Sequence, residues 1–289
     1  IVNTWQQQGA LSYLVLVGDD RALPFYRIRD LTDLYPEKTY GETDKTHPTG
    51  AALYGNYYLS DDYYADREPT TYQGHELYLP DLAVGRLVEA PSDMLRLIDA
   101  FLANPVTHLA AQDAVLVSGY DFVQDMATNV CKAWQTDYGN TAIANCSLIG
   151  DHWLGANLRS AQTRPSQPYK IQVIAGHAAH WVEGAPNNDN IQAHQLLAAN
   201  GQDLSGALIY TPGCHAGLNV PPTDSSKAAD LVQAFAGKGA NYVGHTGYGW
   251  GHVYDIGWSE KLLQFYTQRL LKGQQASMGQ ALTAAKLDY

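Results

Sequence analysis

The sequence predicts an α/β fold in which a mostly parallel sheet is flanked by helices. Short apolar runs typical of strands alternate with longer segments whose apolar residues recur at helical spacing. This alternation is typical of βα units, in which helices connect parallel strands. Several strand segments are apolar throughout, as strands buried on both faces of a sheet are. A chain of 289 residues can form one large domain or two smaller ones.

The N-terminal part, residues 1–110, is predicted to be the smaller subdomain. The run "YLVLVG" at 13–18 predicts a buried strand, and "LAVGRL" at 82–87 predicts another. Between them, 27–73 is polar and rich in Tyr, Thr, Asp, Gly and Pro, and a loop of such length is often functional. "APSDMLRLIDAFLAN" at 90–104 predicts a helix with a serine at its N-cap.

The C-terminal part, residues 111–289, repeats a strand-then-helix pattern. Strands are predicted at 114–119, 142–148, 171–176, 206–211 and 239–244. Helices are predicted at 125–135, 155–163, 190–199, 226–236, 257–272 and 277–287. In a parallel sheet the carboxyl ends of the strands meet at one edge, where ligands bind.

The composition indicates which kinds of partner this chain is suited to bind. The net charge is −11, with only 18 lysines and arginines, which argues against nucleic acid and anionic membranes as main partners. No apolar run approaches the roughly 18–20 residues that cross a bilayer. The chain opens on Ile1 without a charged-then-apolar leader, so we expect a processed form or a piece of a longer precursor.

The three cysteines cannot all pair within the chain. Cys131 and Cys146 are compatible with a disulfide and equally with two buried thiols. Cys214 is left over, in the stretch "ALIYTPGCHAGLNV". An inert core thiol is the usual role of a lone cysteine.

Reactive side chains directly follow the predicted strands and are expected at one sheet edge. They are Tyr120, Asp121, Asp125, His177, His180, Cys214, His215, His245, Tyr248, Trp250 and His252. A thiol is only a few per cent thiolate at neutral pH, so a nucleophilic cysteine needs an imidazole to take its proton. Backbone N–H groups can then stabilise the oxyanion, and a third group can orient the imidazole.

These residues carry a resemblance. "IQVIAGHAAHW" and "ALIYTPGCHAGLNV" resemble the strand-then-His and strand-then-Cys elements of caspase-like cysteine peptidases, and the gingipain family is the nearest match. "YLVLVGDDRALP", "YLSDDYYAD" and "LPDLAVGRL" resemble the gingipain catalytic domain in the same order. The resemblance covers 11–250 and implies a caspase-like sheet with a smaller N-terminal α/β subdomain. It also implies a cysteine endopeptidase acting on proteins or peptides.

The resemblance assigns Cys214 as the nucleophile, His177 as the general base and Asp121 as the acid that orients the histidine. The oxyanion would be held by the backbone N–H groups of Cys214 and Ala178. An alanine stands at 178 where the family usually has glycine, which requires a negative φ there. His180 also lies close to His177 in the sequence.

Two further histidines, His180 and His215, stay open as alternative partners for the thiol. His177 and His180, three residues apart, also allow a zinc site completed by Cys214 or His215, as in a metal-dependent hydrolase. The remaining alternative is a non-catalytic peptide-binding or adhesive domain on a peptidase fold.

For the substrate, the resemblance places Asp125 near the acid at the base of the S1 pocket, and Trp250 in the aromatic wall of that pocket. Tyr248 and His180 are the other predicted substrate-binding residues. An acid at the base of S1 implies cleavage after Arg or Lys.

No cofactor is required for this chemistry, but the resemblance implies a structural calcium ion. "SDDYYAD" at 60–66 offers Asp61, Asp62 and Asp66 as oxygen ligands, or it is a solvated acidic turn. The resemblance also implies an extracellular or cell-surface location.

Overall fold

The computed structural model describes residues 11–41, 43–103, 105, 113–137, 144–163, 168–199, 203–221, 229–272 and 276–289. A five-stranded, wholly parallel sheet with the order β14-β13-β9-β7-β8 is the largest sheet of these residues. Its strands are β7 (Val115–Gly119), β8 (Ala144–Ile149), β9 (Ile171–Ala175), β13 (Leu208–Tyr210) and β14 (Asn241–Val243).

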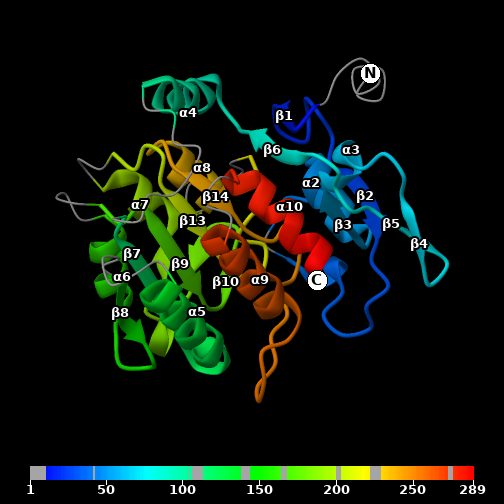
Figure 1. Cartoon of the computed structure of the whole chain (residues 1–289). Coiled ribbons are helices and arrows are strands. Elements are labelled where there is room, and N and C mark those ends of the chain that lie inside the picture. Colours follow the sequence, from blue (N-terminus) through cyan, green and yellow to red (C-terminus); the bar gives the residue numbers. More distant parts are fainter. Residues whose placement is uncertain are drawn as a thin grey trace.

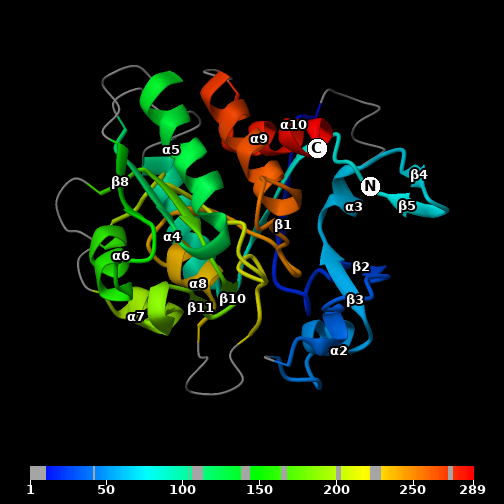
Figure 2. The ribbon, with the colours of Figure 1, turned by 90° about the horizontal axis from the view of Figure 1, so that it is seen from below.

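Helices cover both faces of this sheet, as predicted (Figure 2). One face carries α5 (Gln124–Asp137) and α9 (Trp258–Lys272). The other carries α6 (Gly155–Gln162), α7 (Ala193–Ala198) and α8 (Leu231–Ala236). The predicted mostly parallel sheet flanked by helices is therefore confirmed.

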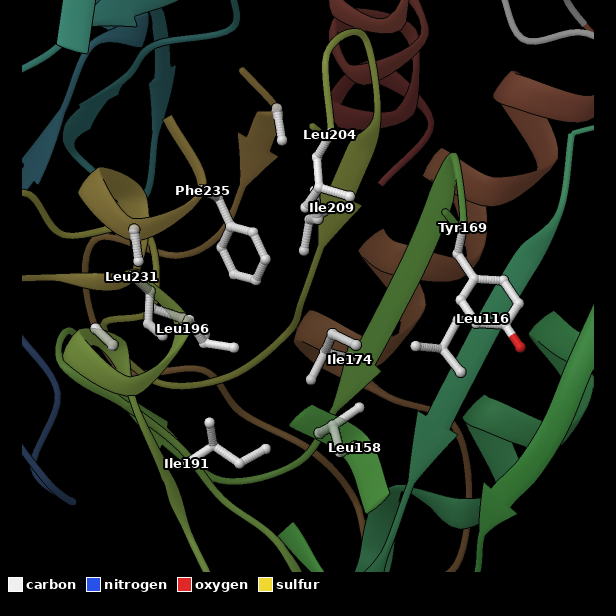
Figure 3. Packing of buried hydrophobic residues seen from close by; sticks show 14 of the residues in the cluster. Leu116, Leu158, Tyr169, Ile174, Ile191, Leu196, Leu204, Ile209, Leu231 and Phe235 are labelled. Carbon is white, nitrogen blue, oxygen red and sulfur yellow. The ribbon is translucent and has the colours of Figure 1, made fainter. Parts of the chain in front are cut away.

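The two faces divide the core, because successive strand residues point to opposite sides. Val115 and Val117 pack against α5 and α9, whereas Leu116 between them packs against the other helix layer. Figure 3 shows the second layer, in which Ile174 and Ile209 meet side chains from the covering helices. Burial on both faces explains why β7 and β9 are apolar almost throughout.

A separate set of short elements forms the N-terminal part (Figure 1). β1 (Tyr13–Val17) pairs in parallel with β6 (Ala83–Leu87). Two antiparallel pairs are β2 (Tyr26–Arg29) with β3 (Tyr57–Ser60), and β4 (Thr70–Tyr72) with β5 (His75–Leu77). The short helices are η1 (Glu37–Thr39), α2 (Pro48–Tyr54) and α3 (Asp62–Ala65), whereas the longer α4 (Pro91–Ala103) contacts α8 of the C-terminal part.

The last helix, α10 (Met278–Asp288), ties the two parts together (Figure 1). It packs on α9, and Lys286 pairs with Asp62 of α3 at 2.6 Å. The Thr283 hydroxyl also donates to the carbonyl of Leu82, beside β6. The predicted parts 1–110 and 111–289 are therefore not separate in the described fold, because α10 belongs to the second part and contacts the first.

Two predictions for the N-terminal part were wrong. β1 is not a buried strand, because the side chains of Tyr13, Val15 and Val17 are exposed and only Leu16 is buried. The polar stretch 27–73 is not one loop, since it contains most of β2, all of β3 and β4, and three short helices. Its apolar residues are too few and too scattered to give a periodic signal.

Cys131 of α5 and Cys146 of β8 form a disulfide, which settles the two alternatives left open by the sequence. Their Cα atoms are 6.3 Å apart. In the described part of the chain, no helix is long and apolar enough to cross a membrane.

Candidate active site

The strand order places a topological switch point between β7 and β9. In chain order the five strands read 2-1-3-4-5, so the connections leave β7 and β9 in opposite directions and open a crevice at their carboxyl ends. β7 runs into Tyr120 and Asp121, and β9 runs into His177. Side chains at this point are therefore placed where doubly wound sheets bind ligands.

Asp121 and His177 meet at this crevice, with Oδ2 of the carboxylate 3.2 Å from Nε2 of the imidazole. Both side chains are more than half exposed, 59% and 58%. A contact this exposed adds little to stability, and its hydrogen bond orients the ring. Tyr120 and Phe122 present their rings edge-on to the imidazole and confine it further.

Asp121 itself sits in a left-handed conformation, with φ of 57°. This is an uncommon conformation for a residue with a side chain, and aspartate is among the residues that tolerate it. The carboxylate of Asp151 accepts the backbone N–H of Asp121 at 2.9 Å and the side-chain amide of Gln124 at 3.1 Å. Asp151 thus fixes the turn from which Asp121 reaches His177.

Cys214 lies on the neighbouring strand end. Residues Val173 and Tyr210 are paired across β9 and β13, and His177 and Cys214 follow this pair at the same spacing. Gly213 lies so close to the histidine turn that a Cβ there would be 2.6 Å from the Cβ of Ala178. The thiol and imidazole turns are therefore in direct contact through a glycine.

The thiol itself is partly buried and donates to the carbonyl of Gly249 at 3.4 Å. Burial raises the pKa of the Cys214 thiol above its ordinary value. Ala178 does not have a positive φ, so the histidine turn can accept an alanine side chain at this position.

The two other histidines are buried and engaged elsewhere. His180 is 2% exposed, and its Nδ1 lies 2.6 Å from the hydroxyl of Tyr40. His215 has no exposed surface, and its Nε2 lies 2.7 Å from Oε2 of Glu37. Of the three histidines near Cys214, His177 alone is exposed to a substrate, and we assign His180 to support of the turn.

The other predicted substrate-binding residues, Tyr248, Trp250 and Asp125, lie on the loop after β14 and at the start of α5. Trp250 and Tyr248 each approach the ring of Tyr35, at 6.1 and 6.2 Å between centroids. Asp125 is exposed in the first turn of α5, and its carboxylate accepts the N–H of Met126. Asp125 is also close enough to add to the raised pKa of Glu260, which is caused mainly by burial.

A pocket of about 550 Å³ opens beside His177. Its lining includes Asp121 and Asp151 and the asparagines at 187, 188 and 190, together with apolar residues such as Val182 and Pro186. Two carboxylates and several amides beside an apolar surface suit a ligand that carries positive charge or amide groups. Asp125, Trp250 and Tyr248 do not line this pocket.

Comparisons with known proteins decide the family. The model of Peptidase family C25 matches residues 1–289 of the chain. The chain belongs to peptidase family C25. The predicted relation to the gingipain family is therefore confirmed, and the members of this family are cysteine peptidases.

The fold of this C25 chain is also that of a solved member. It is similar to the crystal structure of the Arg-specific cysteine proteinase gingipain R, with a TM-score of 0.59 and 12% sequence identity. The match covers 99% of this chain and 61% of that one, so this C25 chain spans less than two thirds of the gingipain R chain. No match was found among curated proteins.

The predicted metal ligands of this C25 chain are engaged by other groups. Asp61 receives two N–H groups of Arg86, one of them at 2.9 Å, and Asp62 pairs with Lys286. Asp66 accepts a backbone N–H at 2.7 Å. Among the described residues, no three His, Cys, Asp or Glu side chains gather as a metal site would require. Calcium binding stays a prediction.

Sequence reasoning missed Glu37, Tyr40 and Asp151, all of which contact residues of the site. Glu37 and Tyr40 lie within the polar stretch of the N-terminal part, far from the motifs in sequence. Only the type of residue was available as a signal, because a contact across 178 positions leaves no local pattern.

Proposed function

We propose that this C25 chain is a cysteine endopeptidase in which Cys214 is the nucleophile, His177 moves the proton and Asp121 orients the imidazole. The observation that carries this proposal is the exposed Asp121–His177 pair at the switch point, next to the turn that bears Cys214. Family membership supports the same chemistry.

The reaction needs one local movement. Cys214 Sγ turns from the carbonyl of Gly249 toward His177, whose Nε2 is held by Asp121, so Nδ1 is the nitrogen that serves the thiol. Transfer of the thiol proton to Nδ1 gives a thiolate and an imidazolium. In this assignment Nε2 carries the hydrogen that Asp121 accepts, and Nδ1 is free of a proton and can accept that of the thiol.

The thiolate then attacks the carbonyl carbon of the scissile bond, and the negative charge moves to the carbonyl oxygen. The backbone N–H groups of Cys214 and Ala178 are proposed to hold this oxyanion. The imidazolium of His177 gives its proton to the leaving amine as the C–N bond breaks, which leaves a thioester on Cys214. His177 then takes a proton from water, and hydroxide attack releases the acid and the thiol.

We propose cleavage after Arg or Lys. Asp125, Trp250 and Tyr248 are the proposed contacts of that basic side chain, with Asp125 supplying the negative charge. The pocket beside His177 then receives the residues on the leaving-group side, because His177 protonates the amine that departs. The net charge of −11 favours basic substrates over acidic ones.

An extracellular or cell-surface location is a further proposal. The Cys131–Cys146 disulfide supports it, because such bonds persist in oxidising compartments. A structural calcium ion is proposed from the gingipain resemblance alone. Partners are expected to be protein or peptide substrates.

One observation favours a second candidate, a non-catalytic peptide-binding or adhesive domain. The thiol of Cys214 faces the carbonyl of Gly249 rather than an imidazole nitrogen. In that candidate the thiol stays unreactive, and the crevice beside His177 only holds a peptide.

A comparison of wild type with Cys214→Ala on a peptide library, with calcium present, separates the two. We expect cleavage by wild type after basic residues and a loss of at least about 1,000-fold in the variant, since removing the nucleophile leaves only residual catalysis. Equal cleavage by both proteins, or cleavage by neither, contradicts the endopeptidase.

A further inference from the structure

The N-terminal part reaches into the candidate active site through Glu37 of η1. The side chain of Glu37 is 6% exposed, so its carboxylate is enclosed by protein. Oε2 lies 2.7 Å from Nε2 of His215, the residue directly after Cys214. Oε1 accepts the backbone N–H of Tyr248 at 2.9 Å. One carboxylate thus holds two segments that are distant from it in sequence.

These two segments build the site. The cysteine turn (residues 212–217) carries the proposed nucleophile, and the wall loop (residues 244–251) carries Tyr248 and Trp250, two of the three proposed substrate contacts. The backbone of His215 donates to Gly247 at 2.8 Å, and Gly217 donates to His245 at 2.8 Å. Glu37 therefore adds side-chain contacts to the backbone hydrogen bonds that already join the cysteine turn to the wall loop.

The fit around this carboxylate is close. A Cβ at Gly247 would lie 2.5 Å from Oε1 of Glu37, so a side chain at 247 is incompatible with this approach. On the other side, the ring of Tyr40 stacks on His215 with centroids 3.6 Å apart and planes inclined by 8°. Tyr40 also bonds His180, in the turn that follows His177.

Glu37 is itself anchored to the N-terminal part. Its backbone N–H donates to the carboxylate of Asp30 at 2.7 Å, and Asp30 bonds Asn56 through its own N–H. A continuous set of hydrogen bonds therefore runs from the end of β2 through η1 to both loops. Nδ1 of His215 is the buried atom of this network that has no hydrogen-bond partner among the described residues. The remaining hydrogen bonds are strengthened by burial and favour one arrangement of the groups that they join.

We propose that Glu37 is a positioning residue that fixes the cysteine turn against the wall loop, so that the N-terminal part is a working component of the active site. The catalytic part of this inference rests on the proposed endopeptidase function. The structural part does not, because it concerns the spacing of the two loops. A displacement of about 1 Å at such a site can cost 100-fold in rate.

The test compares Glu37→Gln with wild type. A glutamine amide has a single oxygen, and if this oxygen accepts the Tyr248 N–H, only the NH2 group is left for Nε2 of His215. The NH2 group can donate there only when the imidazole is protonated at Nδ1, which leaves a buried N–H without a partner, and otherwise the His215 contact is lost. We expect hydrogen exchange of the wall loop to accelerate about tenfold or more and kcat to fall roughly 10- to 100-fold. Glu68→Gln, the same change at an exposed position of the N-terminal part, is the control and should leave both unchanged.

The charge of Glu37 allows the experiment to distinguish a role through charge from a role through position. Burial is the main cause of the raised pKa of Cys214, and the nearby carboxylate of Glu37 adds to it, so removal of this charge lowers that pKa and increases the thiolate fraction. A role through charge alone therefore predicts faster thiol alkylation and an unchanged or higher kcat. The positioning role predicts a lower kcat in spite of the more ionised thiol.

Wall-loop exchange equal to wild type, or a kcat within twofold of it, overturns the inference. If Glu37→Gln gives no folded protein, Glu37→Asp decides in the same assays, because it keeps the charge but is too short to reach both partners. If wild type cleaves no peptide, the endopeptidase proposal fails while hydrogen exchange still decides the role of Glu37.

Discussion

At the residue scale, exposure distinguishes the three histidines that the motifs offered. His180 and His215 are buried against Tyr40 and Glu37, so they can support the turns but not meet a substrate. His177 is exposed and is oriented by Asp121. The sequence could name all three and their order along the chain, but it could not separate them, because burial depends on packing against the N-terminal part.

The pKa of Cys214 yields a pH prediction for the resting enzyme. Because burial raises the pKa of this thiol, its thiolate appears only at higher pH than in the unfolded chain. We expect the midpoint of iodoacetamide alkylation against pH to lie above that of the same protein in urea, with alkylation mapped to Cys214 by mass spectrometry. A midpoint at or below the unfolded value would show that an imidazole already holds the thiol proton at rest.

At the scale of elements, the apolar strands were predicted well because each is buried on both faces. β7, β9 and β13 begin and end close to the predicted limits, and their order brings His177 and Cys214 together as the strand-end rule requires. The exposed β1 was misjudged, since an apolar run shows that a strand is favoured and not which face is covered. β2 and β3 were missed because each has only four residues, which is too short to give a clear periodic signal.

The contact between the two reactive turns depends on Gly213. In Gly213→Ala the new Cβ meets that of Ala178 at 2.6 Å, so the cysteine turn must move away from the histidine turn. We expect a loss of about 1–3 kcal/mol in the free energy of unfolding from the added bulk and at least a tenfold loss of kcat/KM.

Gly85→Ala in β6 is the matched control for this change. A Cβ at Gly85 meets no atom within 4 Å, and its φ is not positive. The control should keep wild-type activity. Wild-type activity in Gly213→Ala as well would show that the spacing of the turns is not critical.

At the scale of the whole molecule, the N-terminal and C-terminal parts are joined by direct contacts. Glu37 enters the active site from the N-terminal part, and α10 returns from the C-terminal part to pack beside β6. The sequence indicated a boundary near 110, but it carries no information about contacts that cross such a boundary. A smaller N-terminal subdomain is thus a useful description of the chain and an incomplete one of the site.

The disulfide between α5 and β8 should contribute to the stability of the whole. It closes a loop of 15 positions, for which loop-closure entropy gives about 3 kcal/mol. We expect Cys131→Ala/Cys146→Ala to lose about that much free energy of unfolding in urea while the alkylation of Cys214 is unchanged. A stability equal to wild type under oxidising conditions would contradict a formed bond.

The central claim is that Cys214 is a nucleophile served by His177, and covalent labelling tests it most directly. Wild type and His177→Ala are incubated with thiol-reactive peptide probes that carry Arg, Lys or Ala at the position before the reactive group. We expect an adduct on Cys214, located by mass spectrometry, that forms fastest with Arg or Lys and at least about 100-fold more slowly in His177→Ala. No adduct with any probe, or equal rates in the two proteins, would contradict the claim.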